Sequence, residues 1–419
     1  MVIAPTFHSK VECTLCASTN LRPLSFLSNT PVANALEDNL EDSVNQELIP
    51  LDIVMCANCS HIQIGTLVSQ EILFANYPYL SNSNSSTATR LNNLAQKLTQ
   101  EFNLDNSSFV IEIGSNDGYL LGCISKCGAK ALGIDPAITP TAIARGNGID
   151  CITDYFSSSL AKRLKSEFSP PTLIVANNVL AHTHELRDVF EGVRLLMNAD
   201  AVLVMEFSYA IDIFEKFLFD TIYHEHISYH TLEPLITFLK DYDLEVFRFE
   251  RFDAHGGSAR VYIKQKNNYR KIEQSVIDGI AYEKEIGIHN PESWKAFNAR
   301  ILELRNQFKS EIDSQKANGK RIVGYGVPAK FSTLFYTLGL NENDFEFIVD
   351  DNPLKIGKYA PGTSLKIRAS SDLSNETPDC IVLFSWNYSQ ELLEKVRKLG
   401  YSKESIVIPL PNFEVHSAN

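Results

Sequence analysis

The segment FVIEIGSNDG at residues 109–118 decides the fold class of this 419-residue chain. Its first five residues are apolar apart from one glutamate, which predicts a buried strand, and the glycines that follow predict a tight turn. Residues 119–126 are typical of a helix, and the next apolar stretch, 131–134, ends in Asp135. A strand, a glycine turn, a helix and a second strand with a carboxylate 21 residues after Gly114 form the pattern of a nucleotide-binding α/β unit.

The glycine turn differs from the GxGxxG pattern of dinucleotide sites because it carries Asp117. That carboxylate stands where a pyrophosphate would lie and would repel it. A cofactor with a cationic sulfonium, an amino acid end and a single adenosine fits such a turn better, and S-adenosylmethionine is that molecule. Asp135, at the tip of the second strand, can hold its ribose diol. The alternative is an α/β turn that binds no ligand.

Strand patterns continue after this unit. Apolar runs at residues 172–176 and 201–206 predict two more buried strands, and residues 244–249 with 258–264 predict a terminal hairpin. This number of strands suits a methyltransferase-type sheet. The polar sequence NNVLAH at residues 177–182 follows the first of these strands, and the carboxyl ends of strands are where open α/β sheets bind ligands.

Residues 220–230, DTIYHEHISYH, contain three histidines, a glutamate and two tyrosines. Histidine can remove or return protons at neutral pH, a glutamate can orient it, and tyrosine can stabilise an oxyanion, so we predict a catalytic cluster. A metal site is one alternative, but the motif is not HExxH, and the histidines on either side of Glu225 would diverge on a helix or a strand. A structural role is the other alternative.

Two CxxC pairs, formed by Cys13, Cys16, Cys56 and Cys59, are separated by 39 residues. Pairs of this kind present four thiolates to one tetrahedral ion, for which zinc is the expected occupant. Four thiolates leave no open position, so we predict one structural zinc ion that replaces the core that about 70 residues barely provide. The alternatives are disulfides, which a reducing compartment disfavours, and four independent thiols. We expect His61 to be a bystander.

The last third of the chain predicts a second unit of the same kind. Residues 272–314 are charge-rich with helical spacing, and KRIVGYGVPAK at residues 320–330 again predicts a strand, a glycine turn and a helix start. Further strands are predicted at residues 345–349, 380–384 and 405–408. Lys330, in the first turn of the helix, could hold a phosphate, and the alternative is a plain packing turn. The turn-rich loop 350–362 could edge the same site.

Composition and charge exclude several classes of function. With 44% hydrophobic and 21% charged residues the chain is globular, and its formal charge of −13 argues against sequence-independent binding of nucleic acid. No apolar run approaches the roughly 18 residues of a membrane span, and residues 1–10 do not form a secretory signal, so we expect a cytoplasmic protein without a membrane partner. We predict an α/β protein with a small zinc-binding domain at residues 1–72, a Rossmann-like methyltransferase domain at 73–266, and a helical linker with a second Rossmann-like domain at 267–419.

Residues 76–86, NYPYLSNSNSS, form a polar run broken by a proline. One interpretation is a linker or surface loop. The other is a lid over a polar ligand, because linkers seldom need two tyrosines, here Tyr77 and Tyr79.

In this order the motifs resemble those of the S-adenosylmethionine-dependent C-methyltransferases of nucleotide-linked 4-keto-deoxysugars. The resemblance covers nearly the whole chain. It is carried by the two CxxC pairs, EIGSNDG at 112–118, NNVLAH at 177–182, YHEHISY at 223–229, HGGSARV at 255–261, GYGVPAK at 324–330 and DDNPLKIGKYAPG at 350–362. It implies that a zinc-binding domain, a cofactor-binding middle domain and a Rossmann-like final domain enclose a nucleotide-diphosphate sugar.

The resemblance also implies how the reaction proceeds. A keto group at sugar carbon 4 acidifies the hydrogen on carbon 3, so a base can generate an enolate whose carbon attacks the sulfonium methyl group. His226 is expected to be the base, Glu225 its orienter or a ligand of a sugar hydroxyl, and Tyr223 a contact of the substrate or enolate. Asn178 and His182 are the candidates for holding the 4-keto oxygen.

The remaining site residues follow from the same resemblance. The cofactor is expected to contact Glu112, Gly114 and Asn116 with its methionine end, Asp135 with its ribose, and Asp154 and Phe156 with its adenine. Gly118 and Asn177 are also expected to bind the cofactor. The family's aromatic and serine-rich stretch before the cofactor domain favours the lid for Tyr77 and Tyr79. Both tyrosines and Lys330 are then expected to bind substrate, Lys330 at the diphosphate.

Two other functions remain open. The cofactor motif does not determine the acceptor, so an enzyme that methylates oxygen or nitrogen of another small metabolite is one alternative. The second is a zinc-knuckle interaction protein with a degenerate methyltransferase core, against which the intact Asp135 and the dense histidine cluster argue. The nucleotide, thymidine or guanosine diphosphate, stays open. Three domains can complete a site within one chain, so we expect a monomer or a weak homo-oligomer.

Overall fold

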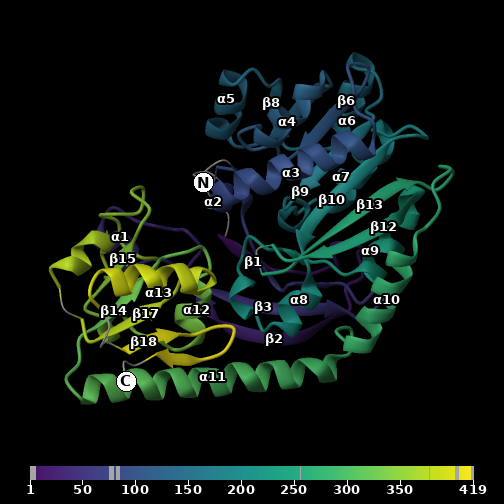
Figure 1. The fold of residues 1–419 in the computed structure, drawn as a ribbon. Helices are drawn as coiled ribbons and strands as arrows, with labels where there is room; N and C mark the ends of the chain where they lie inside the picture. Colours follow the sequence, from purple (N-terminus) through teal and green to yellow (C-terminus); the bar gives the residue numbers. More distant parts are fainter. Residues whose placement is uncertain are drawn as a thin grey trace, which may run out of the picture.

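A computed structural model describes residues 6–74, 80–81, 85–254, 256–376, 378–401 and 405–416. The described chain forms three β-structured parts joined by a long helix (Figure 1). One large sheet lies at each end of the molecule, and the N-terminal strands lie between them, beside the long helix α11 (Pro291–Ala317). No helix in these ranges has the length and apolarity needed to cross a membrane.

The middle part of the chain builds a seven-stranded sheet in the order β12-β13-β10-β9-β6-β7-β8. All neighbours are parallel except β13, which is antiparallel to β10 and to β12. The strands are β6 (Phe109–Ile113), β7 (Lys130–Asp135), β8 (Cys151–Thr153), β9 (Leu173–Asn177), β10 (Val202–Ser208), β12 (Leu244–Phe252) and β13 (Ser258–Gln265). The predicted methyltransferase-type sheet and its terminal hairpin are confirmed.

Helices cover both faces of this sheet. Val110 of β6 packs with α3 (Ser85–Glu101) and α4 (Tyr119–Ile124), and its neighbour Ile111 packs with α6 (Ser158–Glu167) and α7 (Leu186–Leu196). Because successive strand residues point to opposite faces, these helix pairs lie on opposite sides of the sheet. Strands buried on both faces are nearly continuous in apolar residues, which is why the sequence pattern was strong here. The remaining helices of this part are α5 (Ile138–Gly146), α8 (Ala210–Glu215) and α9 (Leu232–Leu239).

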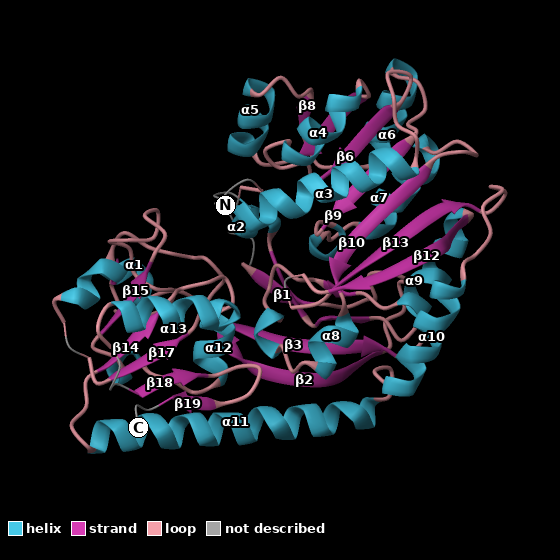
Figure 2. Ribbon diagram, in the orientation of Figure 1, coloured by secondary structure: helices cyan, strands magenta, loops and turns pink. Residues whose placement is uncertain are grey.

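The C-terminal part builds a second, six-stranded sheet in the order β16-β15-β14-β17-β18-β19 (Figure 2). Its first five strands are parallel, and β19 is antiparallel to β18. The elements are β14 (Ile322–Tyr325), α12 (Phe331–Thr337), β15 (Phe347–Asp350), β16 (Ile367–Ala369), β17 (Cys380–Leu383), α13 (Ser389–Lys398), β18 (Ser405–Ile408) and β19 (Glu414–His416). The predicted second Rossmann-like unit is confirmed.

The N-terminal part builds a four-stranded sheet in the order β11-β4-β3-β2 and a two-stranded sheet of β1 with β5. Its elements are β1 (Phe7–Ser9), β2 (Leu21–Thr30), α1 (Leu40–Val44), β3 (Ile49–Cys56), β4 (Ile62–Ile64), β5 (Thr66–Val68) and α2 (Gln70–Phe74). Strand β11 (Ser228–Tyr229) comes from the histidine-rich segment and pairs with β4. The candidate catalytic segment is therefore hydrogen-bonded into the sheet of the zinc-binding part.

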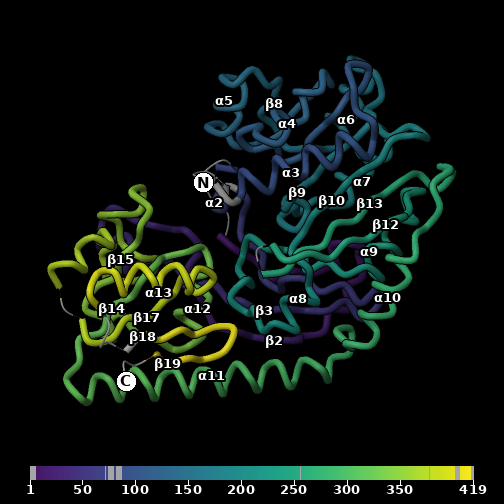
Figure 3. The backbone as a smooth tube through the Cα atoms, in the orientation of Figure 1, coloured from purple at the N-terminus to yellow at the C-terminus, as the bar shows by residue number. Residues whose placement is uncertain are grey.

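Two helices join the two large sheets, as the charge-rich segment predicted. They are α10 (Gln274–Ile286) and α11, which begins after Asn290, whose side chain accepts a hydrogen bond from the Glu292 amide. A polar N-cap followed by proline is a strong helix start. Trp294 and Phe297 of α11 pack against Phe214 of the middle part. The backbone path in Figure 3 shows α11 spanning the molecule from α10 to the C-terminal sheet.

Candidate active site

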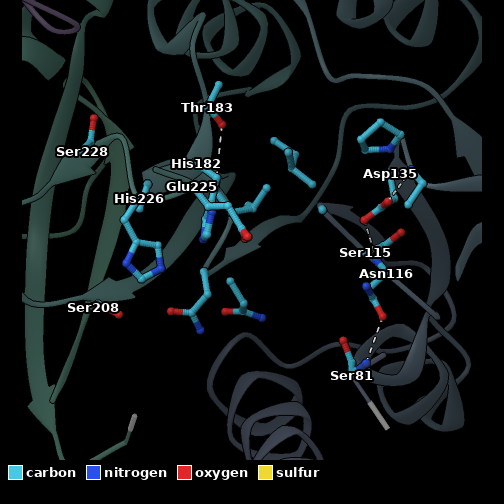
Figure 4. Close-up of a pocket in the computed structure, with 18 of the residues that line it drawn as sticks. Ser81, Ser115, Asn116, Asp135, His182, Thr183, Ser208, Glu225, His226 and Ser228 are labelled. Atoms are coloured by element: carbon cyan, nitrogen blue, oxygen red, sulfur yellow. Dashed lines mark hydrogen bonds between the residues drawn. The ribbon is translucent and has the colours of Figure 1, made fainter. Parts of the chain in front are cut away.

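A pocket of about 430 Å³ opens at the carboxyl ends of β6, β7, β9 and β10 (Figure 4). Parallel strands present their carboxyl ends at one edge of the sheet, which is the edge where α/β folds bind ligands. All three parts of the chain line it. Asn34 and Gln70 come from the zinc-binding part, and Ala329 and Lys330 from the C-terminal part. The middle part supplies the rest, including the glycine turn and the histidine-rich segment.

The glycine turn after β6 forms the floor of one end of this pocket. Gly114 has φ of +71°, and a Cβ atom there would lie 2.6 Å from Val179 Cγ2, so only glycine fits. The carboxylate of Asp135 accepts hydrogen bonds from the amides of Asn116 and Ala137, each at 2.9 Å. Burial raises the pKa of Asp135 although these two amides oppose the shift. The Asn116 side chain in turn accepts from the Ser81 amide at 2.9 Å.

Buried polar atoms without partners mark the same end of the pocket. The Glu112 side chain is buried, and burial, together with the charges of Asp135 and Asp117, raises its pKa well above the usual value. One carboxylate oxygen of Glu112 and both amide atoms of Asn177 have no hydrogen-bond partner in the part of the chain that the structure describes. A buried polar atom without a partner is costly, so these atoms fit a ligand that carries an ammonium group and a carboxylate. The methionine end of S-adenosylmethionine has both.

Two residues expected at the cofactor lie elsewhere. Gly118, with φ of +72°, is the N-cap of α4 and faces a neighbouring crevice instead of this pocket. Asp154 is exposed and does not line the pocket, whereas Tyr155 and Phe156 do. Two aromatic side chains, Tyr155 and Phe156, therefore line the part of the pocket where the adenine was expected, and Phe156 is one of the two residues predicted there.

The residues proposed for catalysis gather at the other end of the pocket. The His226 ring packs against two other rings, with its centroid 4.0 Å from that of Tyr223 and 4.8 Å from that of His182. Its Nδ1 is 2.7 Å from the carbonyl oxygen of Thr221. A carbonyl oxygen can only accept, so Nδ1 carries the hydrogen and the lone pair of the neutral ring is on Nε2. The main chain thus supplies the orienting partner of His226 that the sequence analysis had considered for Glu225.

Burial shifts the pKa values of Glu225 and His182, the two titratable neighbours of His226, in opposite directions. Burial raises the pKa of Glu225 to about 7, opposed by a hydrogen bond from Asn34. Burial lowers the pKa of His182 to about 4, so its ring is neutral at pH 7. A carboxyl group that titrates near neutral pH, beside an imidazole that stays uncharged there, suits proton transfer.

The histidine-rich segment does not build a metal site. His224 points toward the zinc-binding part, where its Nε2 lies 3.2 Å from the carbonyl oxygen of Pro50. His230 is buried against Phe207 and His61. The predicted divergence of the histidines on either side of Glu225 is confirmed. In the described ranges, the cysteine cluster is the one group that could hold a metal ion.

Asn178 is held by a network that the sequence analysis did not find. It has φ of +51°, its amide nitrogen Nδ2 lies 3.1 Å from Glu206 Oε1, and its main-chain amide donates to the Glu206 carbonyl at 2.8 Å. Glu206 is fully buried and also accepts from Arg90 at 2.5 Å and from Arg260 at 2.7 Å. Arg90, on α3, lines the pocket as well. A buried glutamate in β10 is the signal that could have indicated this network, since buried charges are seldom unpaired.

Lys330 closes the pocket from the C-terminal part. It is the N-cap residue of α12, and its Nζ lies 3.9 Å from Asp220 Oδ1 and 5.1 Å from the Trp386 ring centroid. Within the described chain it has no hydrogen-bond partner. It is therefore placed to meet an anionic group. Tyr77 and Tyr79, the other two predicted substrate residues, lie outside the described residues.

The four cysteines of the zinc-binding part lie together as predicted. The sulfur atoms are within 4.8 Å of one another, with Cys13 and Cys59 3.6 Å apart and Cys16 and Cys56 3.5 Å apart. A tetrahedral zinc ion with bonds of about 2.3 Å holds its sulfur ligands about 3.8 Å apart, so this cluster fits one ion. His61 is not part of it. Its Nε2 lies 3.2 Å from Ser228 Oγ, on the histidine-rich segment.

Known families and relatives match this arrangement. Three family models match successive segments, described as a zinc binding domain at residues 13–74, a methyltransferase domain at 87–248 and a C-methyltransferase C-terminal domain at 253–411. The C-methyltransferase NovU of Streptomyces niveus is 27% identical over 407 residues, which cover 97% of each chain.

Two solved structures each match less than half of this chain. Magnesium protoporphyrin IX methyltransferase of Synechocystis is 15% identical over 42% of this chain and 79% of its own, with a TM-score of 0.33. The PH0226 protein of Pyrococcus horikoshii is 13% identical over 46% of this chain and 97% of its own, with a TM-score of 0.36. Likenesses this low carry no argument on function.

The three family models follow one another in the order of the three parts of the fold, and NovU matches the chain from end to end. The resemblance seen in the sequence is thereby confirmed at the level of the reaction class. The chain is similar to C-methyltransferases in all three of its parts, the zinc-binding domain, the methyltransferase domain and the C-methyltransferase C-terminal domain.

Proposed function

We propose that the protein transfers the methyl group of S-adenosylmethionine to carbon 3 of a nucleotide-linked 4-keto-6-deoxysugar, with His226 as the base. One observation carries this proposal above the others. His226 Nδ1 is fixed by the Thr221 carbonyl at 2.7 Å, so Nε2 is the basic atom of the ring, in a pocket whose far end is the glycine turn.

The chain's residues account for the proton transfer. His226 Nε2 takes the proton from carbon 3, and the electron pair of the broken C–H bond moves into an enolate with its charge on the oxygen at carbon 4. Bound S-adenosylmethionine supplies an electrophilic methyl group on a sulfonium. The enolate carbon forms the new C–C bond, and the sulfur keeps the electron pair of the broken S–CH₃ bond.

Two neutral donors are available for the developing negative charge. The ring of His182 is uncharged because burial lowers its pKa to about 4. Asn178 donates one amide hydrogen to Glu206 and has a second for the oxygen at carbon 4. Donors fixed before the reaction stabilise an oxyanion without the cost of reorganisation. Tyr223, whose ring packs against His226, is assigned as a substrate contact, and Glu225 is assigned to a sugar hydroxyl.

The remaining residues of the pocket are assigned to groups of the cofactor and of the sugar nucleotide. Lys330 meets the diphosphate of the sugar nucleotide, Glu112, Gly114, Asn116 and Asn177 hold the methionine end, and Asp135 holds the ribose.

We keep the domain limits 1–72, 73–266 and 267–419, although β11 crosses the first of them by pairing with β4. Residues of one chain line the whole pocket, which supports a monomer or weak homo-oligomer. Both substrates are cytoplasmic metabolites, so we place the reaction there.

A label-transfer assay tests this proposal. Purified protein is incubated with methyl-labelled S-adenosylmethionine and thymidine- or guanosine-linked 4-keto-6-deoxysugars, and mass spectrometry follows the label and the hydrogen at carbon 3. We expect label on carbon with loss of that hydrogen. Label on oxygen or nitrogen, with the hydrogen kept, would instead establish the other class of methyltransferase.

The base is tested by His226→Gln, which we expect to lower kcat by about 10³-fold while the affinity for S-adenosylmethionine stays within twofold. His416→Gln is the matched control, because His416 lies in β19 outside the pocket, with its Nε2 2.8 Å from Glu414. It should keep the wild-type kcat. Full turnover by His226→Gln would remove this residue from the proposal.

A further inference from the structure

The short segment that carries the Thr221 carbonyl is held from the C-terminal part of the molecule. Residues Phe219–Thr221 form a 3-10 helix, and its three side chains are buried. Thr221 lines the pocket, whereas Asp220 does not. The Asp220 carboxylate, with no exposed surface, contacts the second sheet instead. The residues of the C-terminal part that contact the Asp220 carboxylate therefore help to fix the position of the Thr221 carbonyl.

Three contacts cross from the C-terminal part to this segment. Trp386, at the carboxyl end of β17, donates its indole Nε1–H to Asp220 Oδ2 at 2.6 Å. Lys330 places its ammonium 3.9 Å from Asp220 Oδ1. Thr333 of α12 donates its hydroxyl to the carbonyl oxygen of Ile222 at 2.6 Å. All three come from the carboxyl edge of the second sheet, where β14 and β17 end.

These contacts are important because the Asp220 carboxylate is fully buried. Burial raises the pKa of Asp220, and the Lys330 charge and the Trp386 hydrogen bond oppose the shift. Of the two carboxylate oxygens, only Oδ2 has a hydrogen-bond partner within the described residues. Without the indole N–H, the buried carboxylate would keep the ammonium at 3.9 Å and the local main-chain amides of Asp220 and Thr221, but it would lose its one side-chain hydrogen-bond donor within the described residues. A buried carboxylate in that state is expected to rotate or move toward water, and Thr221 is its neighbour in the chain.

We infer that Asp220 and Trp386 are positioning residues through which the C-terminal part sets the geometry of the base. The path is short: the Trp386 indole holds Asp220, Asp220 holds the 3-10 helix, and the Thr221 carbonyl holds His226 Nδ1–H. The inference rests on the proposed function only in naming His226 as the base. The C-terminal part then does more than bind substrate, because it also orients a group on another domain.

The test uses the chain's two tryptophans as a matched pair. Trp386→Phe keeps the ring and removes the hydrogen bond to Asp220. Trp294→Phe does the same at a buried indole that donates to the Ile288 carbonyl at 2.9 Å, away from the pocket. We expect Trp386→Phe to lower kcat by about 10- to 100-fold, the cost of a misplaced catalytic group, with KM and cofactor affinity within twofold. Trp294→Phe should leave kcat unchanged.

A second pair of variants separates position from stability. Asp220→Asn keeps an oxygen that accepts the indole hydrogen, and Asp220→Ala does not. We expect kcat of Asp220→Asn to lie at least fivefold above that of Asp220→Ala at equal folded fraction. Equal kcat for Trp386→Phe and Trp294→Phe, with both folded, would overturn the inference.

A readout without substrate distinguishes this inference from the proposed function. Nitrogen-15 shifts of the histidine rings report which nitrogen carries the hydrogen, and His226→Gln assigns the signal of His226. We expect the Nδ1–H form in the wild type and in Trp294→Phe, and a mixture of both forms in Trp386→Phe. If the wild type methylates none of the sugars but this difference is found, the proposed function fails and the positioning stands. An unchanged Nδ1–H form in Trp386→Phe would overturn the positioning even if the sugars are methylated.

Discussion

The two units with a glycine turn have the same main-chain hydrogen bonds, but the side chains around their turns differ. After β6, the Gly114 amide donates to the Ile134 carbonyl at 2.8 Å, and after β14 the Gly326 amide donates to the Val349 carbonyl at 2.7 Å. Each turn is followed by a second strand that ends in an aspartate, Asp135 or Asp350. The match continues at those aspartates.

Both aspartates are bound by two main-chain amides. Asp135 accepts from Asn116 and Ala137, each at 2.9 Å. Asp350 accepts from Val327 at 2.7 Å and from Asn352 at 2.8 Å. In each unit one amide comes from the glycine turn and the other lies two residues after the aspartate. This pattern follows from the geometry of strand, turn and helix alone and does not depend on a ligand.

The side chains around the two turns differ. Two residues before Gly114 stands the buried Glu112, one of whose carboxylate oxygens has no hydrogen-bond partner among the described residues, whereas two residues before Gly326 stands Gly324, packed against Ile348 and Phe384. Lys355 donates to the Val327 carbonyl at 2.6 Å and lies 3.7 Å from Asp350 Oδ2, so a cation of the chain itself lies against the second glycine turn. The comparison teaches that the turn builds the fold in both units, and that the first turn differs by a pocket with buried, unpartnered polar atoms, which is where we propose that the cofactor binds.

The strongest test of this contrast replaces each aspartate with alanine. We expect Asp135→Ala to weaken S-adenosylmethionine binding about 30- to 100-fold, or about 2–3 kcal/mol, because a charged acceptor of the ribose hydroxyls is lost. Asp350→Ala should leave this affinity within twofold. Isothermal titration calorimetry measures both.

Both variants also remove the acceptor of two amides, so each should lose stability by a similar amount, about 1–3 kcal/mol in chemical unfolding. This shared loss is the internal control. A large loss of cofactor affinity in Asp350→Ala alone would reverse the assignment of the two units.

The contributions of Glu225 in the pocket and of Asp351 beside the second sheet to the free energy of unfolding should change with pH in opposite directions. Burial raises the pKa of Glu225 to about 7 in the folded protein, above its ordinary value of 4.5, so folding takes up a proton between these values and stability falls as pH rises. Glu225→Gln removes this effect. At pH 8 the variant should be more stable than the wild type by up to about 3 kcal/mol, and below about pH 4.5 the difference should vanish.

Asp351 of the second sheet has the opposite shift. Burial alone would raise its pKa, but Lys395 and Ser370 outweigh burial and lower it below 3.8. Its contribution is present above pH 3.8 and is lost as pH falls through the lowered pKa. Asp351→Asn should therefore be less stable than the wild type at pH 7 and equal to it in strong acid. Urea unfolding of both variants from pH 3 to 8 measures the two slopes, and slopes of one sign would contradict the contrast.

Much of this architecture could be predicted because it repeats local patterns. Buried parallel strands are nearly continuous in apolar residues, so both sheets and their turns were found from short segments such as residues 109–118. The paired cysteines predicted the zinc site for the same reason, since their spacing alone implies a common ion. The clustering of Tyr223, Glu225 and His226 was also evident, because their positions are adjacent in the sequence.

What the sequence did not predict are contacts between distant segments. Asn34 lines the pocket from the zinc-binding part, and β11 joins the sheet of that part, although about 160 residues separate β11 from β4. The bond from Trp386 to Asp220 spans 166 residues. Neither residue lies in a pattern that marks its partner, and pairings of this kind are set by how the domains pack. The partner that orients His226 is a main-chain carbonyl, which no residue type in the sequence indicates.

The smallest expected effect tests whether the Lys355 side chain alone prevents the glycine turn after β14 from binding S-adenosylmethionine. Lys355→Met removes the ammonium while retaining the aliphatic stem, so the hydrogen bond to Val327 is lost and Asp350 keeps its two amide donors. We expect a loss of about 1 kcal/mol in the free energy of unfolding. Calorimetry should still find one S-adenosylmethionine per chain, because at Gly324 the second unit has no carboxylate to match Glu112 and a Cβ there would meet Ile348 at 2.9 Å. Binding of a second equivalent would mean that open space is sufficient, and that Lys355 is what separates a cofactor site from a packing turn.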